Sequence, residues 1–325
     1  MRLFDSRAAG LILDALDRAD RRSRGRIVVL TYHRIDHPGA RRHLWPALIS
    51  ASPNAFTRQM EYIARHFVVI GMEQLLAILR GEQPVEARAV MITIDDAYAD
   101  AAEHAWPTLQ RLGMPATLFV PTGAPTMTSG FWWDRLYHAI ETSERASVEI
   151  GGTAHALTGD GRREAFAAAR AVVRAQEHHE AMTTVERLVD DLEVEDAPPE
   201  TLDWPSLKNL ARQGLVLGAH TRHHPRLDAL GLAEATAEIA GSIEDLRREI
   251  GTVPPVLAYP SGDHGPPAPD ASSAAGIVAA FTTRRGAIDV HSADRQRLPR
   301  VNVGRRTGVG LLRAQLGSGM RLLGR

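Results

Sequence analysis

The chain has 325 residues, of which 44% are hydrophobic and 24% are charged, and its formal net charge is -1. This balance provides no basic field for a nucleic acid, so we expect no nucleic-acid partner. The absence of cysteine excludes disulfides, thiolate nucleophiles and zinc sites with cysteine ligands.

The first 26 residues combine an amphipathic pattern with a basic end. Apolar residues recur at helical spacing from Phe4 to Ala19, and arginines gather between Arg21 and Arg26. We predict an amphipathic helix over 1–26 that docks on the protein, with a helix lying on a membrane surface as the alternative. No transmembrane run or secretory pattern is visible, so we expect a cytoplasmic location, with or without membrane association.

Short apolar runs alternate with helical patterns over the next hundred residues. Each run is too short for a helix and apolar throughout, which is typical of a strand buried on both faces. The alternation of strands and helices favours a parallel α/β fold. The predicted strands are 27–31, 67–70, 89–94 and 116–120, and the predicted helices are 56–66, 72–80 and 101–112.

The alternation stops between residues 126 and 200. This segment has no strand pattern of comparable strength, and an alanine-rich stretch over 162–176 favours a helix. We therefore predict a helical insertion over about 126–200 in a domain that spans 27–304, followed by a basic C-terminal tail over 305–325. Beyond the insertion, the predicted strands are 215–218, 256–259 and 277–282, and the predicted helix is 233–250.

Two adjacent carboxylates, Asp95 and Asp96, follow the predicted strand 89–94. Active sites of parallel α/β folds form at the carboxyl edge of the sheet. Neighbouring carboxylates repel each other unless a cation holds them, and a metal bound by one of them satisfies this need. The alternative is that Asp96 caps the next helix and Asp95 is solvated.

His220 and His224 follow the predicted strand 215–218, at the same edge. Their i, i+4 spacing brings both rings to one ion if the loop turns helically. Two histidines and one carboxylate suit one divalent ion, for which we expect zinc, with cobalt, nickel or iron as alternatives. His223 is expected to point away. Surface histidines without a ligand are the alternative for the whole motif.

The order of these motifs resembles that of the polysaccharide deacetylases, the NodB-homology or carbohydrate esterase 4 family. Residues 93–98 (Thr-Ile-Asp-Asp-Ala-Tyr) are similar to the family's TFDDGY signature, and residues 220–224 are similar to its His-Ser/Thr-x-x-His signature. Residues 258–262 (Ala-Tyr-Pro-Ser-Gly) stand where its third motif falls, and 298–303 resemble a late segment of some members. Residues 30–35 (Leu-Thr-Tyr-His-Arg-Ile) resemble the opening of the subgroup that includes poly-N-acetylglucosamine deacetylases. The resemblance covers about 27–125 and 202–304.

This resemblance implies an α/β fold, a distorted (β/α)7 barrel of the NodB type, with one metal ion held by Asp96, His220 and His224. It further implies that Asp95 is the general base in the hydrolysis of N-acetyl, or less often O-acetyl, groups on a glycan or glycan precursor. In the third motif, Tyr259 and Ser261 would border the substrate cleft, and the backbone amide near Ser261 would help to hold the oxyanion.

Four features depart from the family pattern. Ala97 replaces the usual glycine after the aspartate pair, and Ile94 replaces the usual phenylalanine. Ala258 stands where many members have an arginine that orients the base. The insertion separates the two metal motifs by far more than in compact members, which leaves the substrate open.

Two hypotheses concern the missing arginine and the general acid. Arg300, in the late segment, is predicted to reach Asp95 from the cleft region and to replace the missing guanidinium, with a surface ion pair as the alternative. His33 follows the strand 27–31, and the subgroup resemblance implies that it protonates the leaving amine. A histidine suits this role because its ordinary pKa is ~6.5. The alternative is that His33 only hydrogen-bonds a neighbouring loop.

Two rival functions remain open. A deacylase or deformylase of a lipid-linked sugar or a cyclic amide would use the same residues. A non-catalytic glycan-binding protein would explain the missing arginine, although the intact Asp95 argues against it. Trp132 and Trp133 either stack on sugar rings or pack in the core of the insertion, and Asp263 and His264 either line the cleft or lie on a surface loop.

Overall fold

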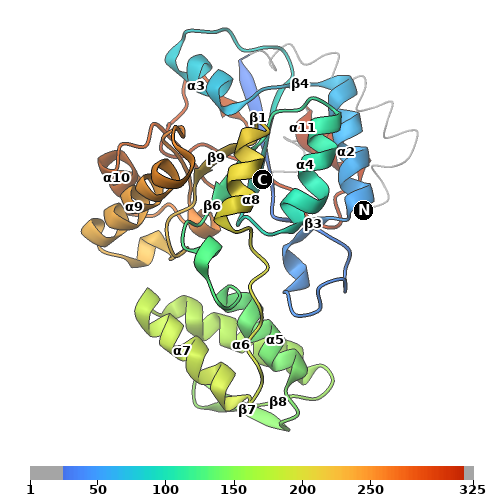
Figure 1. The fold of residues 1–325 in the computed structure, drawn as a ribbon, viewed down its shortest axis with the longest axis vertical. Coiled ribbons are helices and arrows are strands. Elements are labelled where there is room, and N and C mark those ends of the chain that lie inside the picture. Colours follow the sequence, from blue (N-terminus) through green and yellow to red (C-terminus); the bar gives the residue numbers. More distant parts are fainter. Residues whose placement is uncertain (1–24, 318–325) are drawn as a thin grey trace.

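The computed structural model describes residues 25–317, which are built around one curled sheet (Figure 1). Its strands follow the order β11–β10–β9–β6–β5–β1–β12, with β4 also paired to β5 and β13 to β1. All of these pairs are parallel except that of β1 with β12. The strands are β1 (Arg26–Tyr32), β4 (Val68–Val69), β5 (Ala89–Asp95), β6 (Thr117–Val120), β9 (Val216–Ala219), β10 (Val256–Ala258), β11 (Ala279–Phe281), β12 (Ile288–Asp289) and β13 (Val301–Asn302).

The segment before β13 closes the curled sheet into a distorted barrel. Leu298 bridges to Phe281 of β11, and its backbone bonds to the carbonyl of Ala280 and the amide of Thr282, both at 2.9 Å. Three residues later, Val301 pairs with Leu30 of β1. The α/β barrel that the sequence predicts is thereby confirmed.

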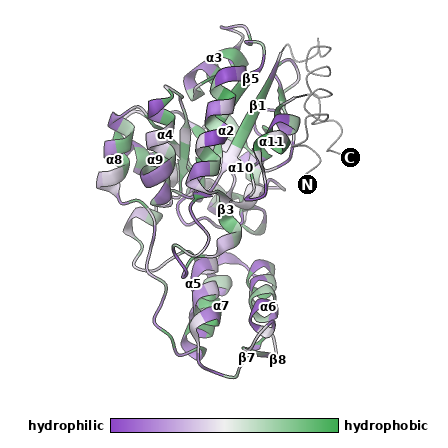
Figure 2. Cartoon of the chain, turned by 90° about the vertical axis from the view of Figure 1, so that its right-hand side faces the viewer, coloured by the Kyte–Doolittle hydropathy of each residue, from purple (hydrophilic) through white to green (hydrophobic). Residues whose placement is uncertain are grey.

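Amphipathic helices cover the outer face of the sheet (Figure 1). Their hydrophobic sides face the strands and their hydrophilic sides face outward (Figure 2). The core between the sheet and these helices, called the outer core below, includes Val90, Ile92 and Ile94 of β5. These side chains point to one face because strand side chains alternate. The helices are α2 (Pro53–His66), the π-helical turn η4 (Ala101–Ala105) that continues into α4 (Trp106–Arg111), α8 (Trp204–Arg212), α9 (Leu232–Ile250), α10 (Ala268–Ala274) and α11 (Val309–Leu316).

The other residues of β5 face the interior of the barrel. Ala89 and Met91 belong to a second core, which includes residues of α3 (Met72–Arg80). Helix α3 lies at the end of the molecule farthest from helices α5 to α7 (Figure 1). Thr93 and Asp95 continue the register of Ala89 and Met91, so the interior changes from apolar to polar towards the carboxyl ends of the strands.

Between β6 and α8 the chain forms a lobe beside the carboxyl end of the barrel (Figure 1). The lobe has its own apolar core, which includes Leu136, Phe166 and Val185. The predicted insertion contains three helices, but the prediction missed an antiparallel hairpin that turns at Gly151 and Gly152. The elements are α5 (Trp132–Thr142), β7 (Ser147–Ile150), β8 (Thr153–Ala156), α6 (Gly161–Ala175) and α7 (His178–Asp191).

The remaining elements are short. Strands β2 (Arg34–Ile35) and β3 (Ile49–Ala51) pair in parallel beside the barrel rim. Residues 1–24 of the predicted amphipathic helix (1–26) and residues 318–325 of the predicted tail lie outside the described residues. Arg26, at the predicted end of that helix, begins β1 instead. The first part of that tail forms α11, whose Leu312 and Leu316 join the outer core. Within residues 25–317, no helix has the length and apolar character needed to cross a membrane.

Candidate active site

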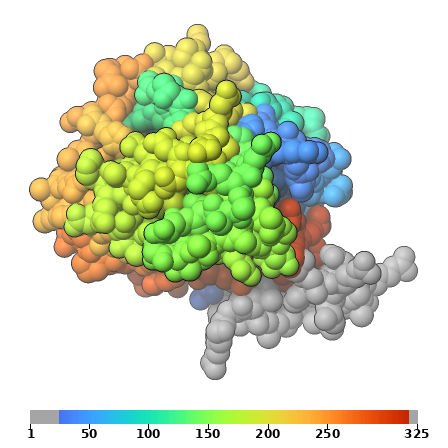
Figure 3. All heavy atoms as spheres, turned by 90° about the horizontal axis from the view of Figure 1, so that it is seen from below, coloured from blue at the N-terminus to red at the C-terminus, as the bar shows by residue number. Residues whose placement is uncertain are grey.

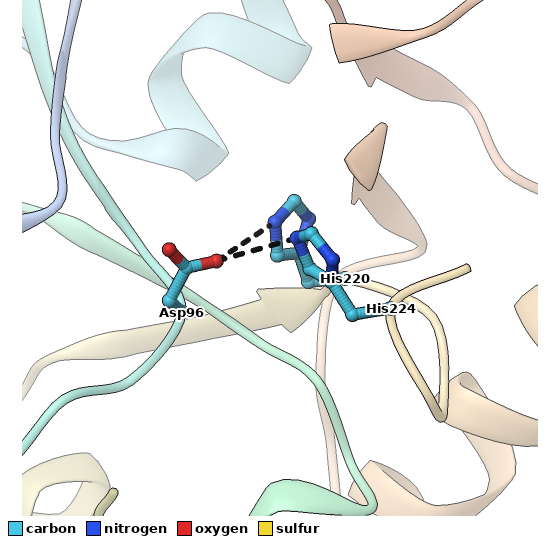
Figure 4. Close-up of side chains that lie close together, drawn as sticks. All are labelled: Asp96, His220 and His224. Carbon is cyan, nitrogen blue, oxygen red and sulfur yellow. Dashed lines mark ion pairs between the residues drawn. The ribbon is translucent and has the colours of Figure 1, made fainter. Parts of the chain in front are cut away.

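Asp96, His220 and His224 converge at the carboxyl end of the barrel (Figure 4). One side-chain oxygen of Asp96, Oδ1, lies 3.3 Å from Nε2 of His220 and 3.5 Å from Nε2 of His224. All three side chains are buried, with at most 8% of each exposed. Because His220 and His224 are buried, the alternative of surface histidines is wrong. The alternative of a helix-capping Asp96 is also wrong, because Asp100 rather than Asp96 precedes the next helix.

Strand alternation aims His220 at the interior. Leu217 and Ala219 of β9 belong to the outer core, so Gly218 and His220 face the barrel. Gly218 has no room for a larger residue, because a Cβ there would lie 2.7 Å from the Phe119 ring. The glycine thus allows the strand that carries the first histidine to approach β6 closely.

The second histidine reaches the site without the helical turn that the i, i+4 spacing predicted. Thr221 and His224 have positive φ angles of 64° and 55°, and the Thr221 hydroxyl accepts a hydrogen bond from the His224 amide at 3.1 Å. The carboxylate of Glu238 in α9 accepts hydrogen bonds from the backbone amides of Arg222 and His223, at 3.1 and 3.0 Å. A tight turn pinned to α9 therefore brings the two rings together, and His223 points away with 61% of its side chain exposed.

The donor set fits a divalent metal ion. Asp96 Oδ1 is buried and has no partner with hydrogen-bond geometry, although it faces two imidazole nitrogens. The carbonyl of Ala258 lies 2.7 Å from Nδ1 of His220, an arrangement that holds the Nδ1–H tautomer and leaves Nε2 free as a ligand. Two imidazoles and one carboxylate are ligands that zinc, iron and cobalt accept.

The protonation preferences of Asp96 and His224 suit a metal site. Burial raises the pKa of Asp96, but the nearby His220 ring opposes this and the pKa falls below its ordinary value. Burial lowers the pKa of His220, and Asp96 and Asp95 raise it by more. Burial and the charge of His220 lower the pKa of His224 to about 4. Near neutral pH, His224 is therefore uncharged and Asp96 is ionised, as metal ligands must be.

Asp95 forms a bidentate ion pair with Arg300 inside the barrel. Nη1 and Nη2 of Arg300 donate to the two carboxylate oxygens at 2.8 and 2.7 Å, and neither side chain is more than 2% exposed. The predicted contact is thus confirmed, and the surface alternative for Arg300 is wrong. Burial raises the pKa of Asp95, but Arg300 and then His220 lower it by more, so the net pKa lies below its ordinary value.

The closing segment explains how Arg300 reaches Asp95. The barrel is closed by residues that bridge β11 and β1, and β1 is the neighbour of β5. Arg300 therefore enters the interior beside Asp95, where it also donates to the Thr282 carbonyl at 3.0 Å and the Thr93 hydroxyl at 3.3 Å. Arg300, near the C-terminal end of the sequence, thus supplies the positive charge that an arginine at the position of Ala258 would provide.

A pocket opens over the three converging side chains. His33 lies in it, which follows from the alternation of Ile27, Val29 and Thr31 along β1. The backbone amide of His33 donates to the hydroxyl of Ser50 in β3 at 2.9 Å. The lining residues are His33, Trp45, Leu48, Asp95, Asp96, Trp132, Trp133, Arg170, Arg174, His220, His224, Ser261, Gly262 and Thr283.

The third motif lies partly in this pocket. Ser261 lines it and has a positive φ of 57°. The placement of Tyr259 in the cleft is wrong, because Tyr259 alternates with Val256 and Ala258 and packs in the outer core with 0% exposure. Its amide bonds to Phe281 and its hydroxyl donates to the Gln296 carbonyl, both at 2.9 Å. Arg300 likewise lies behind Asp95 rather than in the cleft.

The two neighbouring tryptophans have different surroundings. Trp132 is half-buried at the pocket wall. Trp133 is 7% exposed, its ring centroid lies 5.0 Å from that of His224, and its indole N–H donates to the Tyr98 hydroxyl at 2.9 Å. Trp133 therefore packs against the ring of His224 and borders the pocket, so the lobe contributes directly to the site.

Other lining residues carry no signal in the sequence. Trp45 and Leu48 come from the loop before β3, and Arg170 and Arg174 come from α6 of the lobe. The i, i+4 spacing of the two arginines places them on one helix face, but nothing in the sequence shows which face meets the site. Asp263 pairs with Arg174 and Arg226 at 3.7 and 3.4 Å, and His264 bonds to the Gly262 carbonyl.

Comparisons with known proteins agree with this geometry. A family model described as polysaccharide deacetylase matches residues 82–280, more than half of the chain. No curated protein matches the chain.

Three solved structures show the same fold. The deacetylase PplD of Streptococcus pyogenes, solved with acetate, is 17% identical, with 90% of this chain and 99% of that chain covered and a TM-score of 0.62. A de-N-acetylase from Aggregatibacter actinomycetemcomitans is 15% identical, with 89% of this chain and 99% of that chain covered and a TM-score of 0.59. IcaB from Ammonifex degensii is 18% identical, with 90% of this chain and 97% of that chain covered and a TM-score of 0.58.

Proposed function

Because this chain belongs to the polysaccharide deacetylase family, we propose that it is a metal-dependent hydrolase that removes N-acetyl, or less often O-acetyl, groups from a glycan or glycan precursor. One observation carries the proposal: Asp96, His220 and His224 converge in a pocket whose wall holds a second, ionised carboxylate, Asp95. A binding module needs no such base beside a cation.

Asp96, His220 and His224 would hold the ion. When bound, a divalent ion polarises an acyl carbonyl and makes water more acidic. We expect zinc, with cobalt, nickel or iron as alternatives, because the donor set suits all of them.

Asp95 would accept the proton of the attacking water. Arg300 fixes its position through both carboxylate oxygens and lowers its pKa, so the base is ionised and oriented before substrate arrives. Arg300 acts through Asp95 and is therefore a positioning residue.

The backbone amide of Ser261 would donate to the oxyanion that forms on the acyl carbon. His33 would then donate a proton to the amine as it leaves. Ser261 and His33 both line the pocket. His33 and Arg300 lie outside residues 82–280, which the family model matches, so their roles rest on this geometry and on the resemblance of residues 30–35 and 298–303 to family segments.

The rival functions differ in their support. Removal of a formyl or other acyl group from a lipid-linked sugar or a cyclic amide uses the same residues and differs only in substrate. A non-catalytic glycan-binding protein was suggested by the missing arginine, and Arg300 now accounts for that cation.

Acetate release from N-acetylglucosamine oligomers tests the proposal, together with the metal content of each variant. Asp95→Asn should retain about one ion and lose turnover, whereas Asp96→Asn should lose metal affinity as well. Asp294→Asn is the control, because this carboxylate is 49% exposed and pairs only locally with Arg297. Near-normal kcat in Asp95→Asn, or undiminished metal in Asp96→Asn, would remove the assignment.

A further inference from the structure

Arg170 is a cation at the pocket wall without an anionic partner. No ion pair joins it to a carboxylate within residues 25–317, and its Nε is buried without a hydrogen-bond partner. Burial and the neighbouring Arg174 lower the pKa of Arg170, as expected for a positive charge that nothing offsets. An unpaired, partly buried charge costs folding free energy, so the position of Arg170 at the pocket wall calls for a functional reason.

The guanidinium of Arg170 is held in place by aromatic rings. Its central carbon lies 4.0 Å from the centroid of the Trp45 ring and 5.7 Å from that of Phe166. Trp45 is itself fixed, since its amide donates to Asp134 of α5 at 2.7 Å. Stacking orients the plane of the guanidinium, and its N–H groups lie in that plane rather than against the rings.

Arg174, one helical turn farther along α6, adds a second positive charge. Its nearest carboxylate, Asp263, lies at 3.7 Å, beyond hydrogen-bond distance. Asp263 is also shared with Arg226 at 3.4 Å. Two guanidinium groups of the lobe thus line the pocket, and only one of them has a partial partner.

The other charges of the pocket do not offset these arginines. Asp95 is neutralised by Arg300, and Asp96 would be neutralised by the ion. With that ion in place, the pocket presents excess positive charge to whatever enters. Seen from the side of the lobe (Figure 3), the green and yellow residues of the lobe cover the centre of this end of the molecule. The lobe supplies Trp132, Trp133, Arg170 and Arg174 to the pocket wall.

We propose that the lobe recognises an anionic glycan, one that carries a phosphate or a carboxylate close to the acylated sugar, through Arg170 with help from Arg174. This inference rests on the proposed function and names its substrate class. Arg170 would form charge-assisted hydrogen bonds with the anion, while the acyl group meets the base. A neutral polymer would leave the guanidinium without a partner.

Binding of deacylated sugars tests the inference without turnover. With the metal-loaded protein, titration calorimetry should give at least ~10-fold tighter binding of glucosamine 1-phosphate than of glucosamine, the gain typical of hydrogen bonds to charged groups. Arg170→Met should remove this preference, and Arg170→Lys should restore part of it. Arg163→Met, on the same helix with 78% of its side chain exposed, should change nothing.

Further ligands distinguish the source of the anion. Preference for glucuronic acid over glucose would assign a carboxylate, and preference for the sugar phosphate would assign a phosphate. The inference is overturned if wild-type protein binds charged and neutral sugars equally. It also falls if Arg170→Met behaves like Arg163→Met, or if inorganic phosphate alone binds as tightly as the sugar phosphate. Acetate release from N-acetylglucosamine 1-phosphate is a separate measurement. If that release fails while the Arg170-dependent preference holds, the proposed hydrolysis is wrong and the anion site stands.

Discussion

Asp95 and Arg300 are both withdrawn from water, with 2% and 0% of their side chains exposed. Removing two charges from water costs several kcal/mol per ion, and only close pairing with further hydrogen bonds offsets that cost. The bidentate contact and the bonds from Arg300 to Thr282 and Thr93 meet this condition. Loss of one partner alone would leave the other charge buried without compensation.

Arg300→Gln should therefore lower the free energy of unfolding by about 3–5 kcal/mol, and Asp95→Asn/Arg300→Gln should recover part of this loss. Because Arg300 acts through Asp95, the double variant should be no less active than Asp95→Asn alone. Denaturant unfolding and acetate release measure the two effects, with the exposed Arg297→Gln as control. A further loss of activity in the double variant would mean that Arg300 acts on the substrate directly.

His33 is expected to matter only for poor leaving groups. An amine must be protonated as it leaves, whereas a nitrophenolate leaves without a proton. His33→Ala should keep its metal and lower kcat for acetamido sugars by roughly 10²–10⁴-fold, yet hydrolyse 4-nitrophenyl acetate at nearly the wild-type rate. Asp95→Asn should lose both reactions. Equal losses on amide and ester in His33→Ala would show that His33 is not the acid.

The residue types and spacing of the site could be predicted from the sequence, but its backbone could not. Asp96, Ala97, Thr221, His224 and Ser261 all have positive φ, a conformation that costs ~1–2 kcal/mol in residues other than glycine. Such strain persists where surrounding contacts enforce it, and it gathers at functional sites. In Asp96 it breaks the alternation of β5, so two consecutive carboxylates reach one pocket. Ala97 is thus a larger departure from glycine than its size suggests.

At the scale of elements, a buried polar contact ties the lobe to the barrel rim. The carboxyl group of Asp134 in α5 accepts hydrogen bonds from the Tyr98 hydroxyl at 2.5 Å and from the Trp45 backbone amide at 2.7 Å. Asp134 is fully buried, and burial raises its pKa from 3.8 to about 7. This carboxyl group joins the turn after β5, the loop before β3 and the first helix of the lobe.

The sign of the resulting pH dependence follows from that raised pKa. The folded protein holds the proton more tightly than the unfolded chain, so the contribution to stability is full below pH ~4 and is lost as pH rises through ~7. Between pH 5 and pH 8, wild type should lose about 2–3 kcal/mol that Asp134→Asn does not lose. Denaturant unfolding at pH 5 and pH 8 measures the difference, with the exposed Asp160→Asn as control. Parallel pH profiles for wild type and Asp134→Asn would contradict the assignment.

Elements with a strong local pattern were predictable and weak ones were not. The apolar runs of β1, β5 and β6 and the helix α3 lie where the sequence places them. The hairpin β7–β8 was missed although its Gly151-Gly152 pair is a turn signal, because each strand has only four residues. Helix α8 was missed although Asp203 and Pro205 form a cap and a first turn. The π-helical turn η4 has no local signal and reflects tertiary packing.

At the scale of the whole molecule, the proposed ion would join distant parts of the chain. Asp96 follows β5, and the histidines follow β9 beyond the lobe. An ion bound only by the folded protein adds ~2.7 kcal/mol at a concentration of 100 Kd. It therefore stabilises the barrel as well as the reaction.

Removal of the ion by a chelator should therefore lower Tm by about 5 °C or more, and zinc should restore it. His220→Ala/His224→Ala should melt at the same temperature with or without the chelator. His223→Ala should respond like wild type, because this histidine is exposed and pairs with Glu238. A chelator response that survives in the double variant would place the ion elsewhere.

The closure of the barrel sets an order of events during synthesis. Chains grow from the N-terminus at ~5–20 residues per second, so Asp95, Asp96, His220 and His224 all leave the ribosome before residues 298–302. Until then the sheet lacks its bridge between β11 and β1, and Asp95 lacks its counter-charge. Ribosome-bound chains stalled before and after this segment emerges should differ sharply in protease resistance. The same few residues complete both the fold and the base, so the growing chain acquires its chemistry only when its barrel is finished.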